Sequence, residues 1–159
     1  MRWAGVGVAV GFTALTIARN EDYRTEVQIW RDAATKRPDN WRAHATLSSA
    51  LFREQRIAEG LAALEVALKV NPTEAKLHNN YANALALPMV GRWAEAVAAG
   101  ERAVALDPNY AEARNSLAQV LRQVGRGAEA VGQLEVARKL QPESAEIRSN
   151  LCDALRLMG

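Results

Sequence analysis

The sequence predicts an all-α protein, an α-solenoid in which antiparallel helix pairs stack one after another. Alanine, leucine, glutamate and arginine dominate the 159 residues, and these are good helix formers. No segment alternates polar and apolar residues over the length of a strand. Prolines recur at a nearly constant spacing, which indicates an internal repeat.

The composition is that of a folded domain with a mixed-charge surface. Hydrophobic residues make up 49% and charged residues 24%, which favours a folded chain over a disordered one. The net charge is only +2 and both signs are interspersed, which argues against nucleic acid as the main partner. Cys152 is the one cysteine, so an intrachain disulfide or a Cys/His metal box is excluded. Its helical context predicts a small core residue.

Residues 3–18 carry no charge and are bracketed by Arg2 and Arg19. As a helix this segment would span about 24 Å, against about 30 Å for the hydrocarbon core of a membrane. Three interpretations of residues 1–19 remain open: a single membrane anchor, a cleaved signal peptide that leaves a soluble or exported protein, and a helix buried on the repeats. The arginines and lysine that follow favour repeats on the cytoplasmic side.

Two residue types mark the repeat. Four of the five prolines stand at intervals of 34, 36 and 34 residues. An alanine lies five residues before each of them. The prolines are Pro38, Pro72, Pro108 and Pro142, and the alanines are Ala33, Ala67, Ala103 and Ala137.

A 34-residue period with these motifs resembles the tetratricopeptide repeat (TPR). The first full repeat supplies Leu47, Ser48, Leu51, Gly60, Leu64, Ala67 and Pro72. The second supplies Tyr81, Ala82, Leu85, Gly91, Trp93, Ala96, Gly100, Ala103 and Pro108. The third supplies Leu117, Ala118, Leu121, Gly125, Ala130, Leu134, Ala137 and Pro142. The resemblance implies a right-handed superhelix whose concave face is made mostly by the first (A) helix of each pair.

The resemblance divides residues 20–159 into repeats that begin and end with a half. The expected units are a half repeat 20–38, full repeats 39–72, 73–108 and 109–142, and a terminal helix 143–159.

Several residues depart from the family pattern. Glu26 replaces an alanine, which predicts loose packing of the half repeat, and Gly100 is expected to leave a hole where a large side chain is usual. The second repeat has two extra residues. There we expect Pro88 to end the first helix and Gly91 to supply the positive φ of a longer loop.

The sequence contains no catalytic or metal-binding motif, so we expect neither an enzyme nor a cofactor. His44 and His78 are 34 residues apart, at equivalent places in successive A helices, and are interpreted as structural. Most aromatic residues fall at core positions of the repeat, and only Trp41 is expected to be partly exposed. The predicted core aromatics are Tyr23, Trp30, Tyr81 and Trp93.

The resemblance also implies which side chains face the concave groove. Many are primary amides, which donate and accept hydrogen bonds and therefore suit an extended peptide backbone. The carboxylate clamp of chaperone-binding members is not expected, because Ala45 and Ser49 replace its first Lys and Asn, Glu112 replaces a later Lys, and only Asn80 matches. The predicted groove residues are Arg42, Ser49, Phe52, Arg53, Lys76, Asn79, Asn80, Asn83, Asn115, Gln119, Arg122, Ser149 and Asp153.

These observations favour a non-enzymatic scaffold that holds a peptide or protein in its groove and is tethered to a membrane by residues 1–19. An alternative is the non-catalytic tail, or a fragment, of a membrane glycosyltransferase. Residues 16–44 loosely resemble the junction between the last membrane helix and the repeats of bacterial O-mannosyltransferase-like proteins, whose repeats face away from the cytoplasm. A homodimer through the terminal helix is also open. Its apolar side has Ile147, Leu151, Leu155 and Met158.

Overall fold

The computed structural model describes residues 25–157, all of whose regular structure is helical. Residues 1–19, with their anchor, signal-peptide and buried-helix interpretations, lie outside this range. Tyr23 and Met158 also lie outside it. None of the described helices is long and apolar enough to cross a membrane. The helices are α2 (Glu26–Lys36), α3 (Trp41–Arg53), α4 (Ile57–Val70), α5 (Ala75–Leu85), α6 (Trp93–Leu106), α7 (Ala111–Gln123), α8 (Gly127–Leu140) and α9 (Ala145–Arg156).

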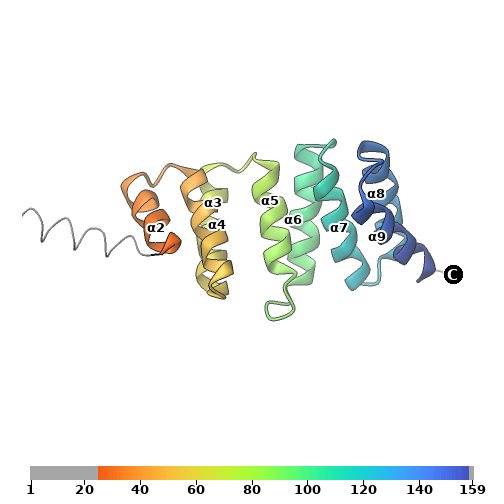
Figure 1. The fold of residues 1–159 in the computed structure, drawn as a ribbon, viewed down its shortest axis with the longest axis horizontal. Helices are drawn as coiled ribbons and strands as arrows, with labels where there is room; N and C mark the ends of the chain where they lie inside the picture. The colour runs from red at the N-terminus through yellow and green to blue at the C-terminus, as the bar shows by residue number, and fades with distance from the viewer. Residues whose placement is uncertain (1–24, 158–159) are drawn as a thin grey trace, which may run out of the picture.

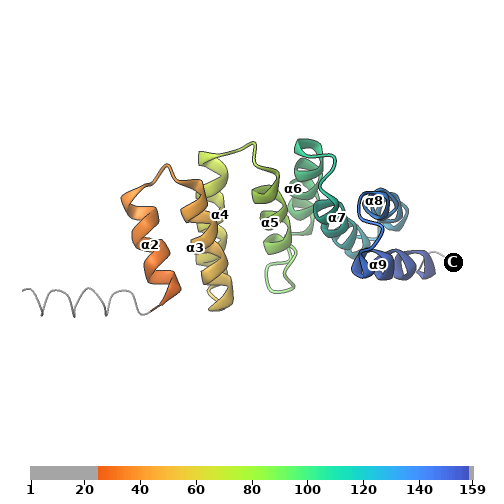
Figure 2. The same cartoon turned by 45° about the horizontal axis from the view of Figure 1, so that its top comes forward.

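The helices pack as consecutive antiparallel pairs along the long axis of the molecule (Figure 1). The A helices α3, α5 and α7 pair with the B helices α4, α6 and α8, while α2 precedes the first pair and α9 follows the last. Each A helix also packs on the B helix before it, so the stack is continuous from one end to the other (Figure 2). The predicted all-α stack of helix pairs is confirmed.

The prolines and alanines that mark the repeat act together at the end of each B helix. Helices α4, α6 and α8 end two residues before Pro72, Pro108 and Pro142, as the missing proline N–H requires. The residue in between closes the helix by donating its N–H to the carbonyl oxygen of the repeat alanine. The distance from Asn71 N to Ala67 O, for example, is 2.9 Å. The three buried alanines Ala67, Ala103 and Ala137 have no exposed surface, so a larger side chain would push the neighbouring helix away.

The two histidines stabilise the turns between repeats. His44 Nε2 lies 3.1 Å from the carbonyl oxygen of Pro38, and His78 Nε2 lies 2.9 Å from that of Pro72. Arg114 takes the same place in the next repeat and donates its Nε–H to Pro108 at 2.9 Å. A turn carbonyl with no helical partner is thus satisfied by a side chain six residues later. This geometry agrees with the structural interpretation of both histidines.

The core consists of two clusters that meet in α4. The smaller cluster joins α2, α3 and α4 and includes Val27, Leu47 and Leu51. The larger one runs from α4 to α9 and includes Leu64 and Leu134. Helix α4 contributes to both clusters from different residues, so the apolar interior passes through this helix.

The predicted core aromatics that the structure describes are only partly buried. Trp30 packs against the smaller cluster, and Tyr81 and Trp93 pack against the larger one. The Tyr81 hydroxyl donates to Glu65 at 3.1 Å, so its polar end is satisfied at the surface of the core. Trp41 is partly exposed, as predicted, and carries the Arg42 guanidinium 4.4 Å from its ring centroid.

An arginine and a glutamate three residues apart begin each B helix of a full pair. Arg56, Arg92 and Arg126 stand at the N-cap positions, where no side chain accepts from the helix N–H groups. Each guanidinium instead donates two hydrogen bonds to a glutamate of the first turn, and both nitrogen–oxygen distances are 2.6 Å in the Arg126–Glu129 pair. These bonds lower the pKa of Glu59, Glu95 and Glu129, because they favour the ionised carboxylates. The carboxylates also lie where the helix dipole favours negative charge.

The loop between α5 and α6 is the longest of the turns inside a pair. Helix α5 ends at Leu85 and α6 begins at Trp93, while only three residues separate α3 from α4. Pro88 lies in this loop and Gly91 has a φ of +63°. The positive φ predicted for Gly91 is confirmed, and α5 ends before Pro88. Part of the extra length comes from the helix itself, because α5 has 11 residues where α3 and α7 have 13.

The corresponding turn of the first pair contains a residue that favours another conformation. Gln55 has a φ of 61°, whereas glycine occupies the equivalent positions 91 and 125. A left-handed conformation costs a non-glycine residue about 1–2 kcal/mol, which a glycine would avoid. Glycine also loses more conformational entropy on folding, and this offsets part of the stabilisation. We therefore expect Gln55→Gly to raise the free energy of unfolding by about 0.5–1 kcal/mol, measured by urea denaturation. Gly125→Ala is the matched variant and should lower it; a less stable Gln55→Gly protein would contradict the prediction.

Three predictions about packing need correction. The space beside Gly100 is filled, because a Cβ atom there would lie 2.9 Å from Leu117 Cδ1. Cys152 is exposed and so is not a core residue. In α9, Ile147 and Leu151 are already buried against the larger cluster, so of the proposed dimer face only Leu155 is exposed among the described residues.

Glu26 does not leave the half repeat without contacts. Its carboxylate accepts a hydrogen bond from Arg53 across to α3, at 2.6 Å, and the next residue, Val27, is buried. Thr25 caps this helix by accepting from the N–H of Gln28, whose side chain accepts from the N–H of Thr25 in return.

Candidate functional site

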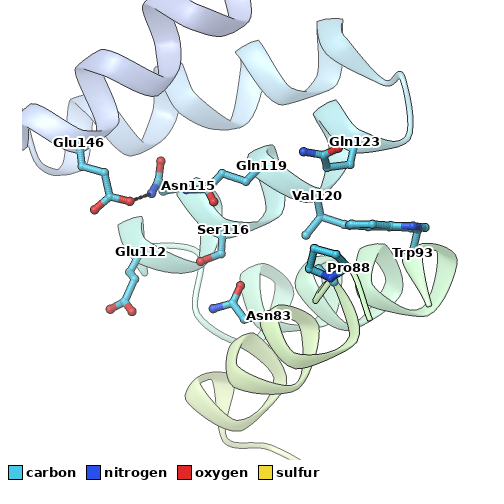
Figure 3. A pocket seen from close by; sticks show the side chains of 11 residues that line it. Asn83, Pro88, Trp93, Glu112, Asn115, Ser116, Gln119, Val120, Gln123 and Glu146 are labelled. Atoms are coloured by element: carbon cyan, nitrogen blue, oxygen red, sulfur yellow. Dashed lines mark hydrogen bonds between the residues drawn. The ribbon is translucent and has the colours of Figure 1, made fainter. Parts of the chain in front are cut away.

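A recess of about 780 Å³ lies over the A helices of the C-terminal half, and we call it the larger recess (Figure 3). Most of its walls come from α5, α7 and α9, with Trp93 added from the start of α6 and Pro88 from the long loop. It is lined by Asn83, Ala86, Pro88, Trp93, Glu112, Asn115, Ser116, Gln119, Val120, Gln123 and Glu146.

Helix α7 supplies the floor because its recess-lining residues recur every three or four positions. Residues 112, 115, 116, 119, 120 and 123 all line the recess, and this spacing places them on one face of the helix. The polar groups in the middle are amides and a hydroxyl, among them the exposed side chains of Asn83 and Gln119. Trp93 and Pro88 lie together at one end, while Glu112 and Glu146 lie at the other (Figure 3).

A partly buried hydrogen-bond network links α7 to α9 beside the recess. The Asn115 amide is 5% exposed, donates to Glu146 Oε1 at 2.8 Å and accepts from the Asn150 amide at 2.8 Å. At the start of α7 the Tyr110 hydroxyl donates to Glu112 Oε2 at 3.3 Å. Burial, and after it the Glu112 carboxylate, raise the pKa of Tyr110 to about 12, so it stays a neutral donor at neutral pH.

A smaller recess of about 360 Å³ lies over the preceding A helices and is more apolar. Asn83 lines both recesses, so they adjoin at this residue. Phe52 forms part of the wall and packs on Gly60, where an added Cβ would lie 2.6 Å from the ring. Glycine at position 60 thus lets this ring pack closely on α4. The lining residues are Ser48, Ser49, Phe52, Leu64, Asn80, Asn83, Ala84 and Leu87.

The structure brings part of the predicted set into these two recesses. The residues it places there are Ser49, Phe52, Asn80, Asn83, Asn115 and Gln119. Their positions agree with a groove made mostly by A helices.

The remaining predicted residues lie elsewhere. Asn79 is only 1% exposed, which corrects its placement on the open face. Arg53 is paired with Glu26, and Asp153 with Arg156 at 3.1 Å. Arg122 lines a separate hollow beside Gly125 and Ala154. Arg42, Lys76 and Ser149 are exposed but line neither recess.

Sequence reasoning missed the apolar end of the larger recess. Trp93 was predicted as core and Pro88 only as a helix end, yet both line the recess. A signal was available, because the two extra residues of the second repeat fall within residues 85–93, a stretch that contains both. A longer loop at that point lets part of the chain reach the edge of the groove.

Comparison with known proteins agrees with this architecture. Two family models, both described as tetratricopeptide repeat, match residues 45–111 and 89–155. Neither of these models describes an enzyme family. No curated protein matches the chain.

Several solved structures share the fold at low sequence identity. MamA superposes with a TM-score of 0.74 at 19% identity, covering 84% of this chain and 77% of MamA. The first TPR of Spaghetti (RPAP3), bound to the HSP90 peptide SRMEEVD, gives 0.69 at 19% identity over 74% of this chain and 92% of that one. The Arabidopsis OM64 TPR domain gives 0.67 at 16% identity over 73% and 94%. With its repeat lattice, helix pairs and two family matches, the chain belongs to the tetratricopeptide-repeat family and is a TPR protein-interaction domain.

Proposed function

We propose that the chain binds an extended segment of another protein in the groove formed by the two recesses. The observation that carries this proposal is their junction at Asn83, which makes one path over α3, α5, α7 and α9. The exposed amides of Asn80, Asn83 and Gln119 along that path can pair with both the N–H and the C=O groups of an extended backbone. The Spaghetti TPR, a structural relative, was solved with a peptide bound.

The chemistry of the lining argues against capture of a C-terminal carboxylate. The residues that line the two recesses include no lysine and no arginine. A carboxylate taken out of water needs a cation or several strong donors to compensate its lost hydration. Neutral amides and apolar surface instead suit an internal stretch of a partner chain.

A peptide screen tests this proposal. We would display random extended peptides, select binders to the full chain and measure their affinity by fluorescence anisotropy. Asn83→Ala combined with Gln119→Ala removes two exposed amides, and each lost hydrogen bond contributes about 1 kcal/mol. We therefore expect binding to weaken about tenfold or more, as 1.4 kcal/mol is a factor of ten.

The matched control is Gln141→Ala, which removes an exposed amide from a turn between repeats and lines neither recess. It should leave the affinity of the selected peptides unchanged. Failure to select any peptide, or equal affinity in the double variant, would refute the groove as the binding surface.

Tethering to a membrane is a separate part of the proposed function. Tethering rests on the uncharged residues 3–18 and their flanking arginines. The alternative, a glycosyltransferase tail, rests on the loose resemblance of residues 16–44 to the junction in O-mannosyltransferase-like proteins. Both concern residues that lie wholly or partly outside the described range. The groove proposal is independent of either, because its residues all lie between 48 and 146.

A further inference from the structure

We propose that the larger recess selects a segment carrying a lysine or arginine side chain, which binds at the end formed by Glu112 and Glu146. This inference rests on the proposed function and specifies the chemistry of the partner. It follows from the charge of the recess, the orientation of its carboxylates and the order of the surfaces along it.

The charge of the recess has one sign. Glu112 and Glu146 are the two charged residues that line it, and the rest of the lining is amide, hydroxyl or apolar. They stand in the first turns of α7 and α9, 34 residues apart, at equivalent positions of successive A helices. The chain as a whole has a net charge of +2, so this negative end is a local feature. A cationic side chain is the complement of such a surface.

Both carboxylates are held in place through one oxygen. Glu146 Oε1 accepts from the buried amide of Asn115 at 2.8 Å, and that amide is itself held by Asn150. Glu112 Oε2 accepts from Tyr110 at 3.3 Å. Each glutamate has a second oxygen outside these bonds. Because the protein already orients these groups, a cation that binds them loses less free energy to side-chain ordering.

The order of the surfaces predicts the order of groups in the partner. The glutamates lie at one end of the recess, Asn83, Ser116 and Gln119 lie between, and Trp93 and Pro88 lie at the far end (Figure 3). A segment that fits would carry a basic side chain on one side and an apolar side chain on the other, with its backbone against the amides.

Synthetic peptides of one host sequence test this preference against the full chain. The host is a serine-rich peptide with one leucine. A second position carries lysine, arginine, norleucine or glutamate, and its distance from the leucine is varied across the series. We expect lysine and arginine peptides to bind more tightly than the norleucine peptide, the glutamate peptide to bind weakest, and added salt to reduce the difference. An ion pair near the surface accounts for up to about fivefold in affinity, so Glu112→Gln with Glu146→Gln should reduce binding of the lysine peptide roughly tenfold.

Both substitutions keep an oxygen that can accept the existing hydrogen bonds, so the fold should be retained, as checked by urea denaturation. Glu135→Gln, which changes an exposed glutamate on α8 that lines neither recess, is the matched control and should have no effect. If peptides bind in a manner that depends on Asn83 and Gln119 but show no preference for a cation, the inference is wrong and the proposed function stands. If none of the peptides and no selected peptide binds, the proposed function fails and the inference with it.

Discussion

Replacing Leu117 with alanine is expected to lower the free energy of unfolding by about 3 kcal/mol, because it empties a buried site that rigid helices surround. Leu117 is 1% exposed and belongs to the larger core cluster. Its side chain fills the space beside Gly100 on the preceding B helix. Leu64 and Leu134 occupy the position of Gly100 in the neighbouring repeats, and both are buried.

Gly100 has no side chain where the neighbouring repeats have leucine, so Leu117 alone fills this space. Gly100→Leu alone should also destabilise, by about 2 kcal/mol, because the new side chain overlaps Leu117. Combined with Leu117→Ala, the leucine at position 100 occupies the space that the alanine leaves. We therefore expect the double variant to be more stable than the sum of the two single losses predicts, by 1 kcal/mol or more.

Urea denaturation followed by circular dichroism measures this coupling. Leu51→Ala combined with Gly100→Leu is the control, since Leu51 belongs to the other core cluster, and its losses should add. Additive losses for Leu117→Ala and Gly100→Leu would show that the two sites do not share one space.

The fold could be predicted from the sequence because stacking imposes a period on it. Prolines and small residues must recur wherever a helix ends or two backbones approach, and four turns in phase leave little ambiguity. The filling of each gap is a different matter. Gly100 predicted a hole only because its own repeat was considered alone, and Leu117 comes from the next repeat.

The groove shows the same division between position and environment. Asn79 and Asn115 occupy equivalent places 36 residues apart, and both were predicted to face the open groove. Both are buried, yet only Asn115 also lines a recess, together with Glu146 from α9. Helical period fixes which way a side chain points, but the neighbouring helix decides how much of it water reaches. Trp93 reaches the recess for a similar reason, since the longer loop before α6 differs from its counterparts.

Local backbone strain could not be predicted from the sequence either. Glycine at 91 and 125 signals a positive φ, but the equivalent Gln55 carries no such signal. The family period identifies its position, and only the backbone shows that glutamine adopts the same conformation there.

Cys152 was assigned to the core from its helix, although it lies on the exposed side of α9.

Asn115→Ala is expected to lower the free energy of unfolding by about 2 kcal/mol, because two hydrogen bonds, one of them to a carboxylate, are lost together. The loss should concentrate in α9, which is held to α7 through Glu146 and Asn150. Amide hydrogen exchange should therefore show faster opening of α9, with little change in α3 or α4. Asn83→Ala is the matched control, an exposed asparagine on the neighbouring A helix, and should change stability little.

Reversing donor and acceptor tests whether the bond itself matters rather than the volume of the side chain. Asn115→Asp keeps the size but sets a second carboxylate against Glu146, so it should destabilise the protein at neutral pH at least as much as alanine does. Adding Glu146→Gln restores a donor facing the new carboxylate, while Asn150 can still donate from the other side. The double variant should regain most of the lost stability and the slow exchange of α9. If it stays as unstable as Asn115→Asp alone, the network between α7 and α9 does not hold the last helix in place.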